Sequence, residues 1–249
     1  MEFNNASIIT VRNNSKRLPK KTIMKIKNEH TALDIIILRC KKMNLPIILA
    51  TTTDTIDDSI CEIGKKYDIE IFRGSAINKI KRWYDCFKKY KIHNALLIDG
   101  DDLCYDFEIG KRAMVELNKS EFDIISSPEN IITGLFTLAV TNNAIERLYS
   151  IASDDSLDTD LFTHLFSKAN LKINNVSLMD FERDEKIRLT LDYEEDLEFF
   201  KKLYQIIDIT ERGEKIIEIL KKNQKLISIN YHKQEDFINN KKIKEEKNG

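Results

Sequence analysis

Cationic side chains gather in one short segment near the N-terminus. They directly follow the apolar residues 6–10, and they are Arg12, Lys16, Arg17, Lys20 and Lys21. Asn13 and Asn14 adopt turn conformations more readily than most residues, and exposed backbone N–H groups in such a turn attract anions. Ser15 adds a hydroxyl donor. A triphosphate suits this set of donors, and a solvated basic loop or a nonspecific nucleic-acid patch is the alternative. The glycines of a P-loop are missing.

Carboxylates form a second candidate group. Asp99, Asp101 and Asp102 come at the end of the apolar residues 95–98, and Asp192 follows residues 187–191. Hard oxygen ligands suit Mg²⁺, so Asp101 and Asp192 can hold one ion between them if both segments end at the same edge of a sheet. In the alternative, each Asp is a turn or cap residue, with Glu195 completing the cap of the helix after Asp192.

Short apolar segments alternate with amphipathic ones along the chain, which is typical of parallel strands joined by helices. We expect strands at residues 6–11, 46–51, 69–72, 95–99, 122–126, 135–140 and 187–191. Apolar stripes at helical spacing begin at Ile56, Ile77, Leu197 and Ile216. Open sheets of this kind bind ligands where strands end, so the basic segment and the carboxylates are expected to meet there.

Composition narrows the class of protein. The 40 basic and 41 acidic residues give a net charge of -1, which argues against a nucleic-acid partner. A signal-peptide pattern and a long apolar segment are both missing, so we expect a cytoplasmic protein without a membrane partner. The four cysteines lack C-x-x-C spacing and are expected to be buried free thiols. We expect a single domain over residues 1–231 and a charged, flexible tail over residues 232–249.

Five motifs appear in a fixed order along the chain. They are R-x-x-S-x-R-L-P-x-K from Arg12 to Lys21, F-R-G-S at residues 72–75, the triplet Arg82, Trp83 and Tyr84, the pair Gly100 and Asp101, and R-L-T-L-D-Y-x-E-D-L from Arg188. With them the sequence resembles the cytidylyltransferases of the CMP-sugar-acid synthetase superfamily, which includes the CMP-KDO and CMP-N-acylneuraminate synthetases. It is most similar to the branch of spore coat polysaccharide biosynthesis protein F.

The resemblance implies an α/β fold of the Rossmann-like nucleotide-diphospho-sugar transferase type, with a mostly parallel central sheet flanked by helices. It also implies CTP as co-substrate, Mg²⁺ as cofactor and a homodimer. The residues that it assigns to CTP and its phosphates are Arg12, Asn13, Ser15, Arg17 and Lys21. It assigns the metal to Asp101 and Asp192, makes these two and the cations Arg12 and Lys21 the catalytic set, and lets Arg73, Ser75, Arg82 and Gly100 shape the adjoining nucleotide site.

The implied reaction moves CMP from CTP to an acidic acceptor, a 3-deoxy-ulosonic or nonulosonic sugar acid, and releases pyrophosphate. Residues 134–140 and 158–160 resemble the part that selects the acceptor, and residues 135–140 are also a candidate dimer interface. Asn78, Leu97 and Leu103 depart from the family pattern. The alternatives are therefore a phosphonate or phosphate monoester as acceptor, or a non-catalytic relative that only binds nucleotide.

Overall fold

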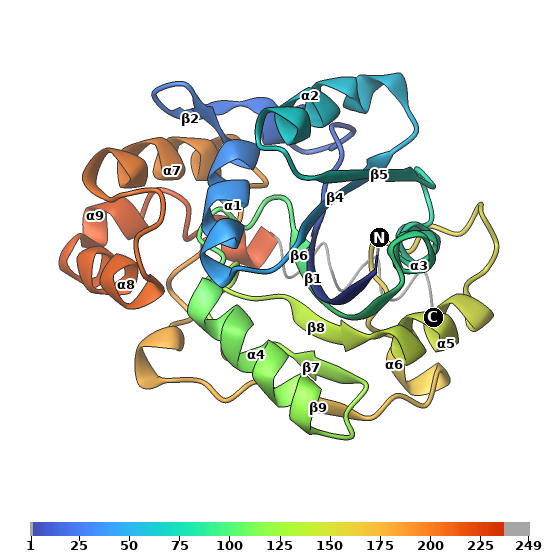
Figure 1. Ribbon diagram of the computed structural model, residues 1–249. Helices are drawn as coiled ribbons and strands as arrows, with labels where there is room; N and C mark the ends of the chain where they lie inside the picture. Colours follow the sequence, from blue (N-terminus) through green and yellow to red (C-terminus); the bar gives the residue numbers. More distant parts are fainter. Residues whose placement is uncertain (1, 237–249) are drawn as a thin grey trace.

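The computed structural model describes residues 2–236, and its centre is a seven-stranded sheet in the order β5-β4-β1-β6-β8-β7-β9 (Figure 1). The strands β1, β4, β5 and β6 pair in parallel, as do β7 and β9, whereas β8 runs antiparallel between β6 and β7. The predicted, mostly parallel α/β sheet is confirmed. The strand bounds are β1 (Phe3–Thr10), β4 (Ile47–Thr52), β5 (Glu70–Gly74), β6 (Ile92–Asp99), β7 (Ile124–Ser126), β8 (Leu138–Thr141) and β9 (Ile173–Asn175).

Helices cover both faces of the sheet (Figure 1). One face carries α3 (Lys79–Tyr90), α5 (Asn142–Ile151) and α6 (Leu165–Lys168). The other face carries α1 (Ala32–Cys40), α2 (Asp58–Lys66), α4 (Phe107–Lys119), α7 (Glu194–Ile206), α8 (Gly213–Lys222) and α9 (Gln224–Ile227). The smaller elements are the hairpin β2 (Lys25–Lys27) and β3 (His30–Thr31) and the 3-10 helices η1 (Lys21–Ile23), η2 (Lys41–Met43), η3 (Thr55–Asp57) and η4 (Asp180–Glu182).

Alternation along β1 explains why the sheet needs cover on both sides. Ala6 and Ile8 enter the core under α3 and α5, whereas Ile9 and Val11 enter the core under α1 and α4. Successive side chains of a strand point to opposite faces of the sheet. A strand with apolar side chains at successive positions must therefore be covered on both faces. The four cysteines are free and buried, which confirms their predicted state.

The segment predicted as a strand at residues 187–191 does not form one. Arg188 makes an isolated parallel bridge with Thr133, and the next contacts go elsewhere, because Leu189 N–H donates to Thr133 O (2.8 Å) and Leu191 N–H donates to Asp101 O (2.9 Å). Two different loops supply these acceptors, so no continuous ladder exists. The segment nevertheless carries Asp192 to the end of β6.

The segment at residues 135–140 is interior rather than an interface. The strand there begins only at Leu138, and it lies between β6 and β7 within the sheet. Leu135 and Phe136, which precede it, are also buried. The prediction of a dimer interface at these residues is therefore wrong, because the chain itself already covers them.

The start of the predicted tail has described contacts. Gln234 accepts a hydrogen bond from Arg188 Nη1 (3.2 Å) and donates one to Thr133 Oγ1 (2.8 Å). Lys233 pairs with Glu195 at the start of α7. The other part of that predicted tail, residues 237–249, lies outside the described residues.

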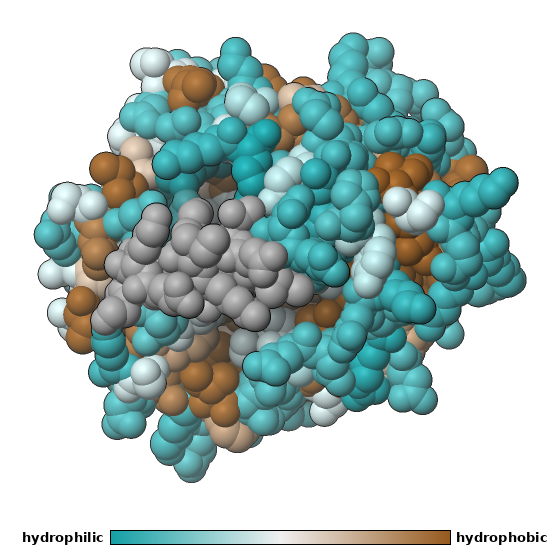
Figure 2. Space-filling model, turned by 180° about the vertical axis from the view of Figure 1, so that it is seen from behind, coloured by the Kyte–Doolittle hydropathy of each residue, from teal (hydrophilic) through white to brown (hydrophobic). Residues whose placement is uncertain are grey.

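Apolar side chains are dispersed over the face opposite to the view of Figure 1, where they form separate small groups in a mostly hydrophilic surface (Figure 2). Isolated exposed apolar side chains are normal for a folded protein. Within residues 2–236, no helix has the length and hydropathy needed to cross a bilayer.

Gly134 fixes the crossing between residues 133–135 and the segment that carries Asp192. Its φ is +91°, and a Cβ there would lie 2.2 Å from Leu189 O. We expect Gly134→Ala to lower the free energy of unfolding by at least about 2 kcal/mol, because backbone strain and a clash with backbone act together. Urea unfolding measures the effect. Gly64→Ala in α2, where a Cβ meets only side-chain atoms at 3.0 Å, is the control and should cost less; equal losses would contradict the prediction.

Candidate active site

The loop between β1 and η1 is held by Asn13. Its backbone N–H donates to Asp57 Oδ1 (2.7 Å), its side-chain amide donates to Ile56 O (2.8 Å), and its Oδ1 accepts from Thr22 Oγ1 (2.7 Å). Asn13 is buried, so its polar groups serve the loop rather than an anion cradle. The left-handed residue of this loop is Lys20 (φ 57°), not one of the asparagines. The loop is thus a fixed turn that delivers Lys21 to the site.

Lys21 brings together the two aspartates predicted as metal ligands. Its Nζ lies 2.6 Å from Asp101 Oδ2 and 2.9 Å from Asp192 Oδ1, although these residues are 80 and 171 positions away in the chain. Asp101 follows β6, Asp192 precedes α7, and Lys21 opens η1. The three residues lie near the ends of β1 and β6, the neighbouring strands between which the strand order of the sheet reverses. Open α/β sheets bind ligands at such a point.

Electrostatics differ sharply between the two aspartates. Burial opposes ionisation of Asp192, but the charges of Lys21 and Arg17 outweigh it and lower the pKa of Asp192 to about 2. For Asp101, burial together with the charges of Asp192 and Asp99 raises the pKa in spite of Lys21. Burial and the neighbouring Asp101 also raise the pKa of Asp102 well above its usual value. The site therefore holds more carboxylate than its cations fully compensate, and it favours an added cation.

Asp192 is fixed from several sides. Its Oδ1 also accepts from Arg17 Nη2 (2.5 Å), and its Oδ2 accepts from the fully buried Arg188 (3.2 Å). Asp196 holds Arg188 in turn through Nε (3.0 Å) and Nη2 (3.1 Å). The same Asp196 carboxylate accepts the backbone N–H groups of Asp192 and Tyr193. The residue that caps α7 is thus Asp196, not Glu195.

The donor set fits Mg²⁺ bound together with a phosphate ligand. Asp101 and Asp192 already share one cation, the Lys21 ammonium, so their oxygens face a common point. Among residues 2–236, no group of three or more His, Cys, Asp or Glu side chains is placed to hold a metal ion by itself. Mg²⁺ commonly takes one or two carboxylates and completes its shell with water and substrate phosphates. Two carboxylates are therefore sufficient.

Arg12 lies on the other side of the same loop. Its Nη1 donates to Ala76 O (2.9 Å), and its Nη2 pairs with Asp160. A hollow of ≈ 290 Å³ opens beside it at the carboxyl ends of β1, β4 and β5. The residues that line this hollow are Arg12, Asn14, Thr52, Asp54, Asp57, Ala76 and Ile77. Asp160 belongs to the predicted acceptor-selecting residues 158–160, which the structure thus brings to the basic loop.

The remaining predicted residues form the walls. Arg73 donates to Thr52 O and Asp54 O (both 2.8 Å) and pairs with Asp58, so it braces the rim of the hollow rather than facing Lys21. Arg82 is buried and donates to Ser75 O (2.7 Å); burial and then the nearby Arg12 lower its pKa to about 10.

Two smaller predicted residues lie at turns. Ser15 N–H donates to Asn13 O (2.9 Å) within the loop. Gly100 follows β6, and a Cβ there would lie 2.7 Å from Val11 Cβ. The close approach that the glycine permits is therefore the one between the ends of β1 and β6.

The three departures from the family pattern have structural roles. Asn78 caps α3 by accepting from Lys81 N–H (2.8 Å), and it donates to Ala152 O (2.7 Å). Leu97 and Leu103 are buried in the two cores. None of the three side chains pairs with Lys21, whose ammonium pairs with Asp101 and Asp192.

Sequence reasoning missed three residues that the structure adds. Asp57 anchors Asn13 and accepts from Thr52 Oγ1 (2.5 Å), Asp196 anchors Arg188, and Lys79 pairs with Asp99 (2.7 Å) at the end of β6. Asp57 and Lys79 each sit at the start of a helix, where a polar residue is ordinary. Asp196 had one available signal, since a carboxylate in the first turn of a helix commonly caps it.

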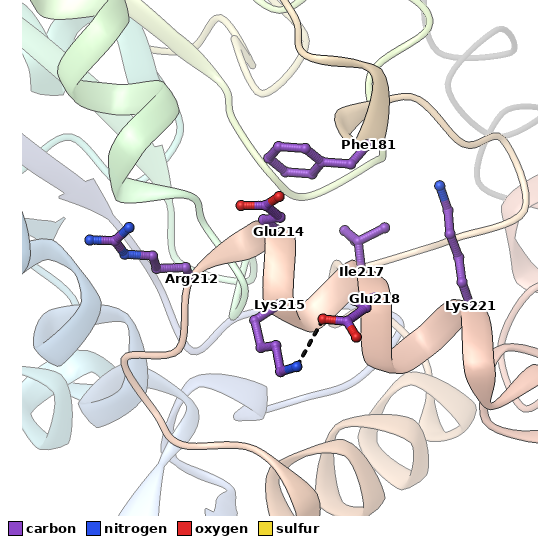
Figure 3. Close-up of a pocket in the computed structure, with 7 residues that line it drawn as sticks. All are labelled: Phe181, Arg212, Glu214, Lys215, Ile217, Glu218 and Lys221. Atoms are coloured by element: carbon purple, nitrogen blue, oxygen red, sulfur yellow. Dashed lines mark hydrogen bonds and ion pairs between the residues drawn. The ribbon is translucent and has the colours of Figure 1, made fainter.

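A second hollow, of ≈ 440 Å³, lies away from the strand ends, between α8 and η4 (Figure 3). Phe181 and Ile217 supply its apolar side chains from η4 and α8, and Lys215 pairs with Glu218 on α8. None of the predicted site residues lines it.

Comparisons with known proteins identify the family of the chain. A sequence profile of the family described as Cytidylyltransferase matches residues 6–240. The uncharacterized protein MJ1063 of Methanocaldococcus jannaschii is 30% identical over 205 residues, which are 81% of this chain and 84% of that protein.

Solved structures share the fold. A cytidylyltransferase from Leptospira borgpetersenii serovar Hardjo-bovis superposes with a TM-score of 0.80 at 25% identity, covering 91% of this chain and 97% of that one. CMP:2-keto-3-deoxy-manno-octonic acid synthetase complexed with CTP superposes with a TM-score of 0.60 at 11% identity, covering 81% of this chain and 98% of that one. The expected nucleotide-diphospho-sugar transferase-like fold is confirmed.

Proposed function

Because the chain belongs to the cytidylyltransferase family, we propose that it transfers CMP from CTP to an acidic small-molecule acceptor. Cytidylyl transfer is the family's activity, and the class of acceptor is our proposal. The acceptor that we favour is a 3-deoxy-ulosonic or nonulosonic sugar acid. Its hydroxyl oxygen forms a bond to the α-phosphorus of CTP, the bond from that phosphorus to the pyrophosphate oxygen breaks, and the hydroxyl proton is released.

One observation carries this proposal. The Lys21 ammonium pairs with both Asp101 and Asp192, and the three residues come from distant parts of the chain. Arg17 pairs with Asp192 in the same cluster. In a solvated basic patch, the cations would not be paired with buried carboxylates, as Lys21 is with Asp192. Convergence of two carboxylates and two cations at the sheet's switch point is instead suited to a magnesium-bound triphosphate.

Phosphoryl-transfer chemistry needs positioning and charge neutralisation more than covalent help. In our proposal Arg12, Arg17 and Lys21 bind and orient the phosphates of CTP. Asp101 and Asp192 hold Mg²⁺, which when bound supplies further neutralisation of the triphosphate charge. Asn13 and Arg73 contribute by keeping the loop and the rim of the hollow in place.

The finer classification also stays a proposal. We assign the protein to the branch of spore coat polysaccharide biosynthesis protein F on the motif that begins at Arg188. We propose a homodimer on the same resemblance, to be measured by sedimentation. Acceptor selection by residues 158–160 is supported by the pairing of Asp160 with Arg12.

Metal removal tests the reaction. With CTP, Mg²⁺ and a panel of sugar acids, phosphonates and phosphate monoesters, we expect pyrophosphate release with at least one sugar acid. EDTA should abolish release, because Asp101 and Asp192 then lack their ion, and added Mg²⁺ should restore it. UTP in place of CTP is the control for the nucleotide. Tight CTP binding without pyrophosphate release across the panel would identify a nucleotide-binding relative that has lost turnover.

A further inference from the structure

A second buried ammonium, that of Lys79, lies near the cluster around Lys21. Lys79, the first residue of α3, has a side chain that is 11% exposed, and its Nζ donates to Asp99 Oδ1 (2.7 Å). The same Nζ lies 5.0 Å from the centroid of the Trp83 ring and 5.5 Å from that of Phe162. The two rings meet edge to face at 4.9 Å, and Trp83 Nε1 donates to Thr10 Oγ1 (2.8 Å). The ammonium is thus held in place by aromatic faces and one carboxylate.

The partner carboxylate lies at the end of β6 and is partly exposed. Asp99 is 34% exposed, and it precedes Asp101 by two residues, so their Cα atoms are at most about 7 Å apart. Lys79 therefore contacts one end of the short acidic segment 99–101 and Lys21 contacts the other. An ammonium has three N–H donors. Within residues 2–236, the hydrogen-bond acceptor found for Lys79 is Asp99.

We propose that Lys79 binds the anionic group of the acceptor, with the buried rings of Trp83 and Phe162 holding its ammonium from the core side. An oxyanion would reach the ammonium by joining or replacing the partly exposed carboxylate of Asp99. The inference rests on the proposed function, and it names the group by which the substrate is recognised: a carboxylate or a phosphonate or phosphate, carried next to the attacking hydroxyl.

Charge distribution favours the acceptor over CTP as the ligand of Lys79. The triphosphate already has Arg12, Arg17 and Lys21, which all come from the loop after β1. Lys79 comes from a different element, α3, and its counter-ion Asp99 is the last residue of β6. Two anionic substrates need separate cations if they are to approach one another, because like charges repel strongly at a partly dry site. Lys79 supplies the second of them.

The steady-state test uses three variants. For Lys79→Met we expect the acceptor KM to rise about 10- to 100-fold, the usual loss for a hydrogen bond to a charged group, while the KM for CTP stays within about twofold. Lys79→Arg should recover most of the loss. Lys88→Met is the matched control, because Lys88 lies on the same helix and also over a ring, that of Tyr84 at 4.8 Å. An unchanged acceptor KM in Lys79→Met, or equal effects on both substrates, would overturn the proposal.

A binding readout keeps the proposal testable without turnover. Trp83 is the only tryptophan of the sequence, so intrinsic fluorescence reports on the Lys79 subsite. In the presence of Mg²⁺ and α,β-methylene-CTP, an analogue that cannot release pyrophosphate, we would titrate N-acetylneuraminate as the carboxylate probe, and 2-aminoethylphosphonate and glycerol 3-phosphate as the phosphorus probes. We expect one chemical class to change the emission of the wild type and of Lys79→Arg but not of Lys79→Met, and that class identifies the anion.

The outcomes separate this inference from the function on which it rests. Calorimetry with CTP and Mg²⁺ alone measures nucleotide binding, in which Lys79 has no part. Failure of the wild type to bind CTP would count against the proposed function. Normal CTP binding with no emission change for any probe, or with the same change in Lys79→Met, would count against Lys79 alone.

Discussion

A Lys21→Met enzyme is expected to lose about 10²- to 10³-fold in kcat, the loss typical of removing one preorganised charge contact from a transition state. Lys21 Nζ pairs with both Asp101 and Asp192. Methionine keeps the length of the side chain but carries no charge, so the developing pyrophosphate loses a fixed cation. Pyrophosphate release at saturating CTP and acceptor measures the change.

Lys16→Met is the matched control for that experiment. Lys16 belongs to the same loop but is exposed, so its charge is solvated and should contribute little. Circular dichroism and thermal melting establish that both variants are folded. If Lys16→Met and Lys21→Met lost activity to the same extent, the loop would act as a general basic patch, and the assignment of Lys21 to the reacting phosphates would be abandoned.

The second large effect concerns stability. Asp196→Ala is expected to lower the free energy of unfolding by about 3–5 kcal/mol, because it leaves the buried Arg188 without its main partner. Its carboxylate also accepts from the backbone N–H groups of Asp192 (2.8 Å) and Tyr193 (3.0 Å) and from Asn230 Nδ2 (2.8 Å). Each of these donors loses the Asp196 carboxylate as an acceptor in the variant. Guanidinium or urea unfolding at neutral pH measures the loss.

Glu198→Ala serves as the reference substitution for Asp196→Ala. Glu198 lies in the same helix α7 and pairs with Lys202 on the surface, where an ion pair contributes at most about 1 kcal/mol. A small loss for Asp196→Ala, comparable with that of Glu198→Ala, would show that Arg188 finds other partners. It would then also follow that Asp192 does not depend on this network for its position.

The parallel half of the sheet was predictable because its strands are buried on both faces. Uninterrupted apolar segments such as residues 6–10 indicate such strands directly. The other half was harder to predict, since β8 is as apolar as its neighbours yet antiparallel, and direction has no signature in composition. Residues 187–191 were misread for a similar reason. Their alternating apolar side chains are buried, but their backbone partners belong to separate loops.

The candidate site was predictable where charge stood out against an apolar background. Lys21, Asp101 and Asp192 followed or adjoined apolar segments, and the structure places them in contact. Asn13 shows the limit of such reasoning. Its type indicated a turn, but its inward direction depends on Asp57, which comes from a separate part of the chain. Lys79 was invisible for the opposite reason, because a lysine at the start of an amphipathic helix is commonplace.

The sharing of Lys21 between Asp101 and Asp192 has a consequence for how the protein matures. Two aspartates forced together without a counter-charge would repel, and many small metalloproteins stay unfolded until an ion arrives. Here the polypeptide provides its own compensating cation, because Lys21 pairs with both aspartates. We therefore expect folding to need no metal ion, and the Mg²⁺ that we propose would be a requirement of turnover rather than of architecture.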